Sequence, residues 1–331
     1  MNDIDNTLEQ LLRRASPRPV PDAEAAAAAR EAVRSEWQAV SGRHRSRRKV
    51  LRFAVAASVL VAVFSVFSLF RVAEVGVTQV ASIQKSSGSI YVLGEQSELL
   101  RAEKLTAIHE GQVIVTGDDA GIALTWSSGG SLRLDKNTEV DFRDHETVFL
   151  RSGQIYFDSQ ASELIANVGA VGPVSFQVET EHGVVSHVGT QFMTEVNAGK
   201  LKVSVREGQV DVAGQYYAQS ASRGEQLVFS GRQRPLVLSF PEYGAAWDWI
   251  AAVSPSVSVN GKSVHEFLNW AGRELGMSIR YIDDDVERVA RKTLLVGRID
   301  TEPREALRLR MMTVALDWRS EEGVIYVSNS L

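Results

Sequence analysis

The spacing of apolar residues changes several times along the chain, and each spacing predicts a different kind of structure. Near the N-terminus, apolar residues at helical spacing define one face of a short helix: Ile4, Leu8, Leu11 and Leu12. The stretch "SPRPVP", residues 16–21, ends this helix, because proline lacks the amide donor and its ring clashes with the preceding turn. The first element is therefore expected to be a short amphipathic helix.

The stretch "DAEAAAAAREAVRSEWQAV", residues 22–40, predicts a second helix. Asp22 can cap its first turn, and alanine favours the helical state. One face carries apolar residues: Ala26, Ala29, Val33, Trp37 and Val40. Two short amphipathic helices cannot form a stable core within residues 1–49. We therefore expect these helices to dock on a partner, with a loosely structured tether as the alternative. The expected docking residues are Ile4, Leu8, Leu11, Leu12, Val33, Trp37 and Val40.

Residues 53–70 contain no charge and predict a membrane-spanning helix. A helix of this length rises about 27 Å, close to the ~30 Å of a bilayer core. Basic residues gather before it: Arg43, Arg45, Arg47, Arg48, Lys49 and Arg52. Only Arg71 follows closely, so the positive-inside rule predicts a cytoplasmic N-terminus and an outer C-terminal part. The long preceding segment and the lack of an A-x-A pattern argue against a cleaved signal peptide, and a buried helix is the remaining alternative.

From residue 82 onward the apolar period becomes two, which predicts strands and tight turns. Segments such as "SLRL", "EVDF" and "KLKVSVREGQVDV" alternate in this way. Segments 148–157 and 203–212 resemble each other, and in both the alternation slips beside a glycine, Gly153 or Gly208. The slip predicts a turn or bulge, and we expect the two glycines at equivalent turns of neighbouring hairpins. Uneven glycine spacing argues against a propeller and favours stacked hairpins or a solenoid-like roll over residues 80–232.

Beyond a short connecting stretch the period changes again and predicts a small α+β domain over residues 255–331. Ser263 and Glu266 fit a capping box, and Gly276 ends the helix that follows. The segment "MSIRYI" is expected to be a strand. A second unit runs from "TLLVGRI" through a helix with Pro303 in its first turn to a hairpin, "ALDWRS" and "GVIYVS". The pattern predicts a β-α-β unit used twice.

Composition indicates a folded chain with different surroundings at its two ends. It is 44% hydrophobic and 23% charged, and it contains no cysteine, which excludes disulfides and cysteine chemistry. Residues 1–71 hold 12 basic and 7 acidic side chains, a net +5, whereas the whole chain carries −5, so the remainder carries −10. The expected fold class is α+β. It comprises a helical cytoplasmic segment, one transmembrane helix, a β-rich domain and a small C-terminal domain.

The sequence contains no recognisable catalytic, metal-binding or cofactor-binding motif, and we expect no enzyme activity. His182 and His187 are five residues apart, so their side chains would face opposite ways on a strand. Asp118-Asp119 and the acidic run at residues 283–285 lie beside turn signals and lack the spacing of a calcium loop. We expect both acidic groups to be solvated turns.

The segment "FQVETEHGVVSHVGTQFMTEVNAGKLKVSVREGQVDV" resembles the FecR family of bacterial transmembrane sensors. It carries the family pattern at Phe176, Val178, Thr180, Gly183, Val188, Gly189, Thr190, Phe192, Val203, Val205, Glu207, Gly208, Val210 and Val212. Gly117 and "GSLRL" at residues 130–134 match the usual lead-in. The C-terminal domain resembles the short N-terminal domain of secretins and TonB-dependent receptors, which many family members carry.

This resemblance implies a role in signal transduction. Proteins of the family hold an extracytoplasmic-function sigma factor with their cytoplasmic helices. They sense the signalling domain of a TonB-dependent outer-membrane receptor through their periplasmic part, often in the regulation of iron transport. By this resemblance the chain is a single-pass protein of the bacterial inner membrane. It would bind a sigma factor through residues 1–49 and would not contact nucleic acid directly.

Two other functions stay open from the sequence. One is a structural protein, anchored in the membrane, that binds the cell envelope and has no sigma partner. A structural anchor needs only basic residues before the span, so the amphipathic faces and Trp37 favour signalling. The other is an anchored hydrolase, which lacks a recognisable set of nucleophile, base and orienting group.

Overall fold

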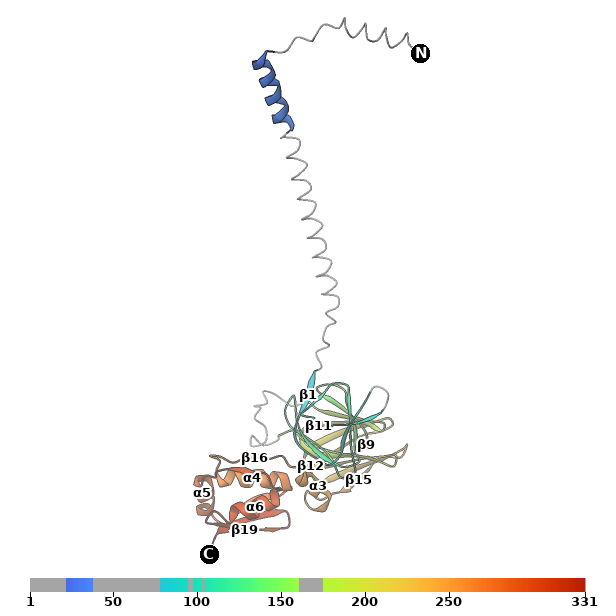
Figure 1. The fold of residues 1–331 in the computed structure, drawn as a ribbon. Helices are drawn as coiled ribbons and strands as arrows, with labels where there is room; N and C mark the ends of the chain where they lie inside the picture. The colour runs from blue at the N-terminus through green and yellow to red at the C-terminus, as the bar shows by residue number, and fades with distance from the viewer. Residues whose placement is uncertain (1–21, 38–77, 95–97, 103–104, 161–174, 331) are drawn as a thin grey trace. The chain divides into compact units, whose positions relative to one another are not determined.

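The computed structural model describes residues 22–37, 78–94, 98–102, 105–160 and 175–330 (Figure 1). The chain divides into two units, Met1–Gly76 and Val77–Leu331. No helix among the described residues is long and apolar enough to cross a membrane. The span predicted at residues 53–70 lies outside the described residues, so it stays a prediction.

In the first unit, residues 23–37 form a helix. The side chain of Asp22 accepts a hydrogen bond from the backbone N–H of Glu24 at 3.3 Å, which confirms the predicted cap. The helix is exposed along nearly its whole length, and Val33 and Trp37 are 70% and 71% exposed. The other expected docking residues lie outside the described residues: Ile4, Leu8, Leu11, Leu12 and Val40.

The β domain, residues 79–239, forms a 15-stranded sheet. Its first eight strands are β1 (Gln79–Ser87), β2 (Ile90–Leu93), β3 (Leu99–Arg101), β4 (Ala107–His109), β5 (Gln112–Thr116), β6 (Gly121–Trp126), β7 (Ser131–Leu134) and β8 (Glu139–Phe142). The others are β9 (Thr147–Asp158), β10 (Gln177–Thr180), β11 (Gly183–Asn197), β12 (Lys200–Gly214), β13 (Ala218–Ser222), β14 (Glu225–Ser230) and β15 (Leu236–Ser239).

The strand pairings divide this sheet into two layers that enclose one core. Sheet A has the order β3-β2-β5-β8-β9-β10-β11-β12-β13, and sheet B has the order β4-β1-β6-β7-β9-β11-β12-β14-β15. The long strands β9, β11 and β12 contribute one half to each sheet. Leu150 of sheet A and Phe157 of sheet B are both fully buried in the same apolar cluster. The chain thus winds between two packed layers and is rich in β structure, as the alternating pattern predicted.

Gly153, Gly189 and Gly208 lie where β9, β11 and β12 pass from one sheet to the other. Their φ angles are 91°, 58° and 77°, a region that favours glycine. The expected turns are wrong, because Gly153 and Gly208 lie inside continuous strands. Each follows a β-bulge whose extra residue, Arg151 or Arg206, has no register partner. The predicted equivalence of the two glycines is confirmed, since both bulges bend a strand without interrupting its pairing.

A connecting segment, residues 240–254, joins the β domain to the C-terminal domain, residues 257–329. The segment contains η1 (Ala245–Trp247) and α3 (Asp248–Ala252). The elements of the C-terminal domain are β16 (Val257–Ser258), α4 (Val264–Leu275), β17 (Ser278–Tyr281), α5 (Asp284–Lys292), β18 (Arg298–Ile299), α6 (Pro303–Met311), β19 (Leu316–Glu321) and β20 (Val324–Asn329). Apolar residues of these helices and strands form one core.

The helix signals of the C-terminal domain are confirmed. The Ser263 hydroxyl accepts from the N–H of Glu266 at 3.2 Å, and the Glu266 carboxylate accepts from the N–H of Ser263 at 2.7 Å. Gly276 ends α4 with a φ of 68°, and Pro303 is the first residue of α6. The local chemistry at these positions therefore sets the helix boundaries.

Two expectations for this domain are wrong. Residues 283–285 are not a solvated turn, because Asp283 caps α5 by accepting from the N–H of Val286 at 2.8 Å. The β-α-β unit is not repeated within one sheet. Strand β16 pairs antiparallel with β18, whereas β17 pairs parallel with β20, and β19 completes that sheet. The strands before and after α4 therefore belong to different sheets.

Candidate functional site

The outer face of sheet B carries polar side chains that are nevertheless buried. Along β7, alternation turns Leu132 and Leu134 into the core and Arg133 to the outer face. Tyr156 of β9 is the register partner of Arg133 and lies on the same face. Both residues are only 2% exposed, because the connecting segment and α4 cover them. This face is an internal interface between two domains of one unit.

Arg133 forms a buried bidentate ion pair with Glu274 of α4. Nη1 lies 2.7 Å from Oε2, and Nη2 lies 2.7 Å from Oε1. Nη1 also donates to the carbonyl oxygen of Ile250 at 2.7 Å. Burial by itself lowers the pKa of Arg133, but the charge and hydrogen bonds of Glu274 outweigh burial and leave this pKa above its ordinary value. The guanidinium therefore stays charged inside the interface.

Arg206, the bulge residue of β12, is a second buried arginine. Its Nε donates to the carbonyl oxygen of Glu242 at 2.7 Å, and its Nη1 donates to that of Glu274 at 3.2 Å. The guanidinium carbon lies 4.3 Å from the centre of the Trp247 ring. Burial lowers the pKa of Arg206. Gly276 permits this approach, because a Cβ there would overlap both the Glu242 carbonyl oxygen and the Arg206 guanidinium.

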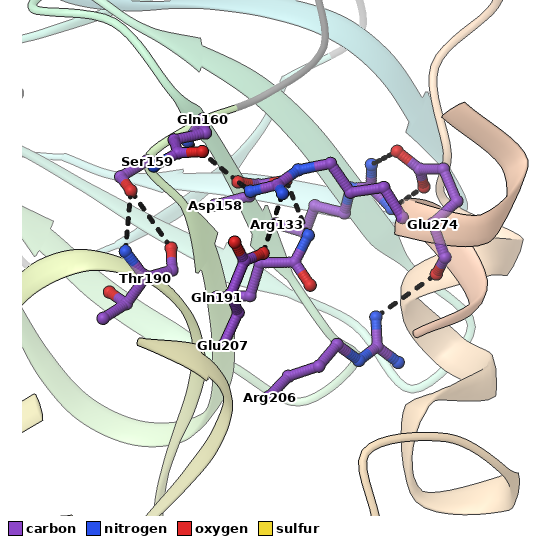
Figure 2. A network of polar contacts seen from close by, with 10 residues as sticks. Arg133, Asp158, Ser159, Gln160, Thr190, Gln191, Arg206, Glu207 and Glu274 are labelled. Atoms are coloured by element: carbon purple, nitrogen blue, oxygen red, sulfur yellow. Dashed lines mark hydrogen bonds and ion pairs between the residues drawn. The ribbon is translucent and has the colours of Figure 1, made fainter. Parts of the chain in front are cut away.

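A third arginine, Arg273 of α4, reaches two carboxylates of the β domain. Its Nε lies 2.9 Å from Asp158, with a second contact through Nη2, and its Nη1 lies 2.7 Å from Glu207. Gln191 donates to the same Asp158 carboxylate at 3.0 Å, and Figure 2 shows Asp158, Gln191 and Glu207 close together on the β domain. Burial lowers the pKa of Arg273, but the hydrogen bonds and charge of Asp158 outweigh it and raise the pKa overall.

Apolar side chains complete this contact. Tyr156 and Met193 of sheet B pack against Trp247 and Ile250 of the connecting segment. The rings of Tyr156 and Trp247 meet edge to face, with centroids 6.3 Å apart. We call the whole set the docking interface: Arg133, Tyr156, Asp158, Met193, Arg206, Glu207, Trp247, Ile250, Arg273 and Glu274. It joins aromatic packing to two ion-paired arginines and to Arg206, which donates to two carbonyl oxygens, so it fixes orientation as well as contact.

A cleft of about 290 Å³ opens beside the docking interface, and Arg206, Arg223 and Arg273 line it with Glu207 and Glu242. Arg223 is paired with Glu242, and Arg273 is paired with Glu207. The cations of the cleft are therefore largely neutralised by its own carboxylates. Among the described residues, no group of histidine, aspartate and glutamate side chains could hold a metal ion. The chemistry of this site is suited to holding two domains in register.

The family model described as "FecR protein" matches residues 112–211, which run from β5 into β12. The β domain is a FecR domain. The matched range contains Arg133, Asp158, Arg206 and Glu207 of the docking interface, together with both bulges. The partners of these residues on α4 lie outside it.

Two solved structures align with part of this chain. Both are of a candidate anti-sigma factor from Parabacteroides distasonis ATCC 8503, at 2.50 Å and 1.65 Å resolution. They are 17% and 18% identical to this chain and cover 66% of it, and the chain covers 97% and 98% of them. The TM-score is 0.32 for both, so this likeness carries no conclusion. No curated protein matches the chain.

Sequence reasoning did not find the docking interface. The predicted docking residues lie on the N-terminal segment, where Val33 and Trp37 share the exposed face of the helix. On the FecR domain, alternation showed only that Arg133 points away from the core. On α4, Glu274 lies off the predicted apolar stripe and is buried against the FecR domain, whereas Trp270 packs in the core of the C-terminal domain. No local pattern in the sequence distinguishes a glutamate buried in this way from a solvated one.

Proposed function

We propose that this chain is a single-pass regulator of an extracytoplasmic-function sigma factor in the bacterial inner membrane. Its FecR domain and C-terminal domain would lie in the periplasm, and residues 1–49 would bind the sigma factor in the cytoplasm. The observation that carries the proposal is the FecR domain at residues 112–211, beyond a basic cluster and an uncharged stretch at residues 53–70. A TonB-dependent outer-membrane receptor is the proposed source of the signal, by family resemblance.

The helix at residues 23–37 supports the cytoplasmic half of this proposal. Val33 and Trp37 lie one turn apart and are 70% and 71% exposed. An exposed tryptophan on a helix face is a common anchor for an apolar groove on a partner. We propose that the sigma factor covers this face and that Trp37 contributes most to binding.

The docking interface supports the periplasmic half. It joins the FecR domain to the C-terminal domain through buried ion pairs, so a ligand bound to one domain can act on the other. We propose that the periplasmic signal changes this docking and that the change is passed to the N-terminal segment. A structural envelope protein would need no such coupling.

Sigma binding is tested by co-purification of the full-length chain with candidate sigma factors from the native cell. Replacement of Trp37 by alanine should weaken capture by about 2 kcal/mol or more if Trp37 is a hot spot. Glu31→Ala, on the opposite side of the helix, is the matched control and should leave capture unchanged. If no sigma factor is captured, and Trp37→Ala leaves target-gene expression unchanged, the structural anchor becomes the better assignment.

Topology is tested by reporter fusions that are active only outside the cytoplasm. A fusion after Leu331 should be active, and a fusion after Val40 should be inactive. The opposite pattern would contradict the proposed division between a cytoplasmic and a periplasmic part.

A further inference from the structure

Strand β15 is an open edge of sheet B and carries exposed apolar side chains. In the described part of the chain it pairs only with β14, and all four of its residues are exposed. Leu236, Val237 and Leu238 have 60%, 45% and 45% of their surface exposed. A long or flat apolar edge strand is ordinarily avoided, because its unpaired backbone groups invite another strand. We therefore expect this edge to pair with another strand.

The backbone of β15 offers a defined set of donors and acceptors to that partner. The N–H of Phe240 donates to Gly224 on the β14 side at 2.8 Å. Because backbone directions alternate along a strand, Leu238 and Leu236 also face β14. Val237 and Ser239 then point their N–H and C=O groups toward the open edge. An added strand would meet these groups directly.

The charges around β15 indicate that the added strand is β15 of a second copy of this chain. Arg234 precedes the strand and is exposed, and in the part of the chain that the structure describes it has no carboxylate partner. The other end of the strand carries a net negative charge, since Glu225 lies opposite Ser239, and Glu242, which follows closely, is paired with a single arginine, Arg223. An antiparallel pair of identical strands brings the basic start of one beside the acidic end of the other. The edge is thus complementary to itself.

We propose that β15 pairs antiparallel with β15 of a second copy and joins two FecR domains into one continuous sheet. We infer the register that pairs Val237 with Ser239 of the other copy, because this register uses the outward N–H and C=O groups of both residues on each strand. The two-fold axis then passes between the two Leu238 residues. They form a non-hydrogen-bonded pair with Cα atoms about 4.5 Å apart. The contact is short, so it is a weak association that a shared membrane surface would favour.

The absence of cysteine in this chain makes the test direct. In the full-length chain in its native membrane, Leu238→Cys places two thiols across the axis at a separation that a disulfide can span. Mild oxidation should give a covalent dimer on a non-reducing gel. Met312→Cys, on the C-terminal domain and 75% exposed, is the matched control and should give at least about tenfold less dimer.

A second variant tests the charge argument. Arg234→Glu in the Leu238→Cys chain places like charges together and should slow disulfide formation about threefold or more. Arg234 is exposed, so this change leaves folding intact. Equal dimer yields from the Leu238→Cys and Met312→Cys chains would overturn the proposal, as would a covalent product of the Leu238→Cys chain with a different protein. An unchanged rate in the Arg234→Glu chain would overturn the proposed self-complementarity and register.

Discussion

Removal of one charge from the Arg133–Glu274 pair tests whether the docking interface is held as described. Glu274→Gln keeps the shape of the side chain but leaves the Arg133 guanidinium charged and 2% exposed. The amide oxygen of the new side chain and the carbonyl oxygen of Ile250 still accept from the guanidinium, but neither carries a compensating charge. Breaking a buried pair in this way costs about 3–5 kcal/mol, because an uncompensated charge stays in the interior. We expect a loss of this size in the free energy of unfolding.

The double variant separates the cost of a lone buried charge from the net contribution of the ion pair to the free energy of unfolding. Arg133→Met together with Glu274→Leu removes both charges and restores apolar volume. Such replacements are often neutral or stabilising by about 1–4 kcal/mol. We therefore expect the double variant to be more stable than either single variant. This non-additivity is the signature of direct contact between the two side chains.

Unfolding in denaturant, followed by tryptophan fluorescence, measures these differences in the purified full-length chain. Trp247 is 2% exposed and belongs to the docking interface, so its fluorescence reports the opening of the interface. Glu195→Gln is the control, because Glu195 pairs with Lys202 at a half-exposed surface where ion pairs contribute little. If Glu274→Gln costs no more than Glu195→Gln, or if the single losses add in the double variant, the ion pair does not hold the domains together.

Three further predictions concern the FecR domain and the C-terminal domain. Gly153→Ala should destabilise by about 2–4 kcal/mol in thermal unfolding, because a Cβ would overlap the turn between β7 and β8. Gly111→Ala has a similar φ but open space, and it should cost only about 1–2 kcal/mol. Asp283→Ala should cost about 1 kcal/mol through loss of the α5 cap, whereas Asp285→Ala, followed by the same assay, should cost clearly less. Burial lowers the pKa of His187, so as the pH falls this histidine is protonated in the unfolded state before it is protonated in the folded state. The free energy of unfolding should therefore decrease as the pH falls below about 6.5. Unfolding of His187→Phe should show less of this loss between pH 7 and pH 5.

Local patterns predicted much of the fold correctly. The period of two identified strands β7, β8, β9 and β12, and capping chemistry placed both ends of α4. These features depend on residues that are neighbours in the sequence, so they can be predicted from the sequence alone. Helix α5 was missed because its acidic first turn, residues 283–285, looks like a solvated turn. Aspartate is favoured both in turns and at helix N-termini, and only the buried Val286 and Ala290 distinguish the two here.

The strand pairing of the C-terminal domain could not be read from order alone. The sequence shows that β16, α4 and β17 follow one another, but both a parallel pair and two separate sheets satisfy that order. The distinction depends on β18 and β20, which take β16 and β17 as their partners. These contacts join residues far apart in sequence, where single-segment periodicity carries no information.

The two bulges explain why the docking interface escaped prediction. Both strands carry the same local motif, with an arginine as the extra bulge residue and a glycine two positions later. In β9 the motif places Arg151 on the open face of sheet A, 46% exposed and paired with Glu139 and Asp141. In β12 it places Arg206 under α4, 3% exposed. The motif sets where the side chain points, and the opposing element decides whether it meets water or a second domain.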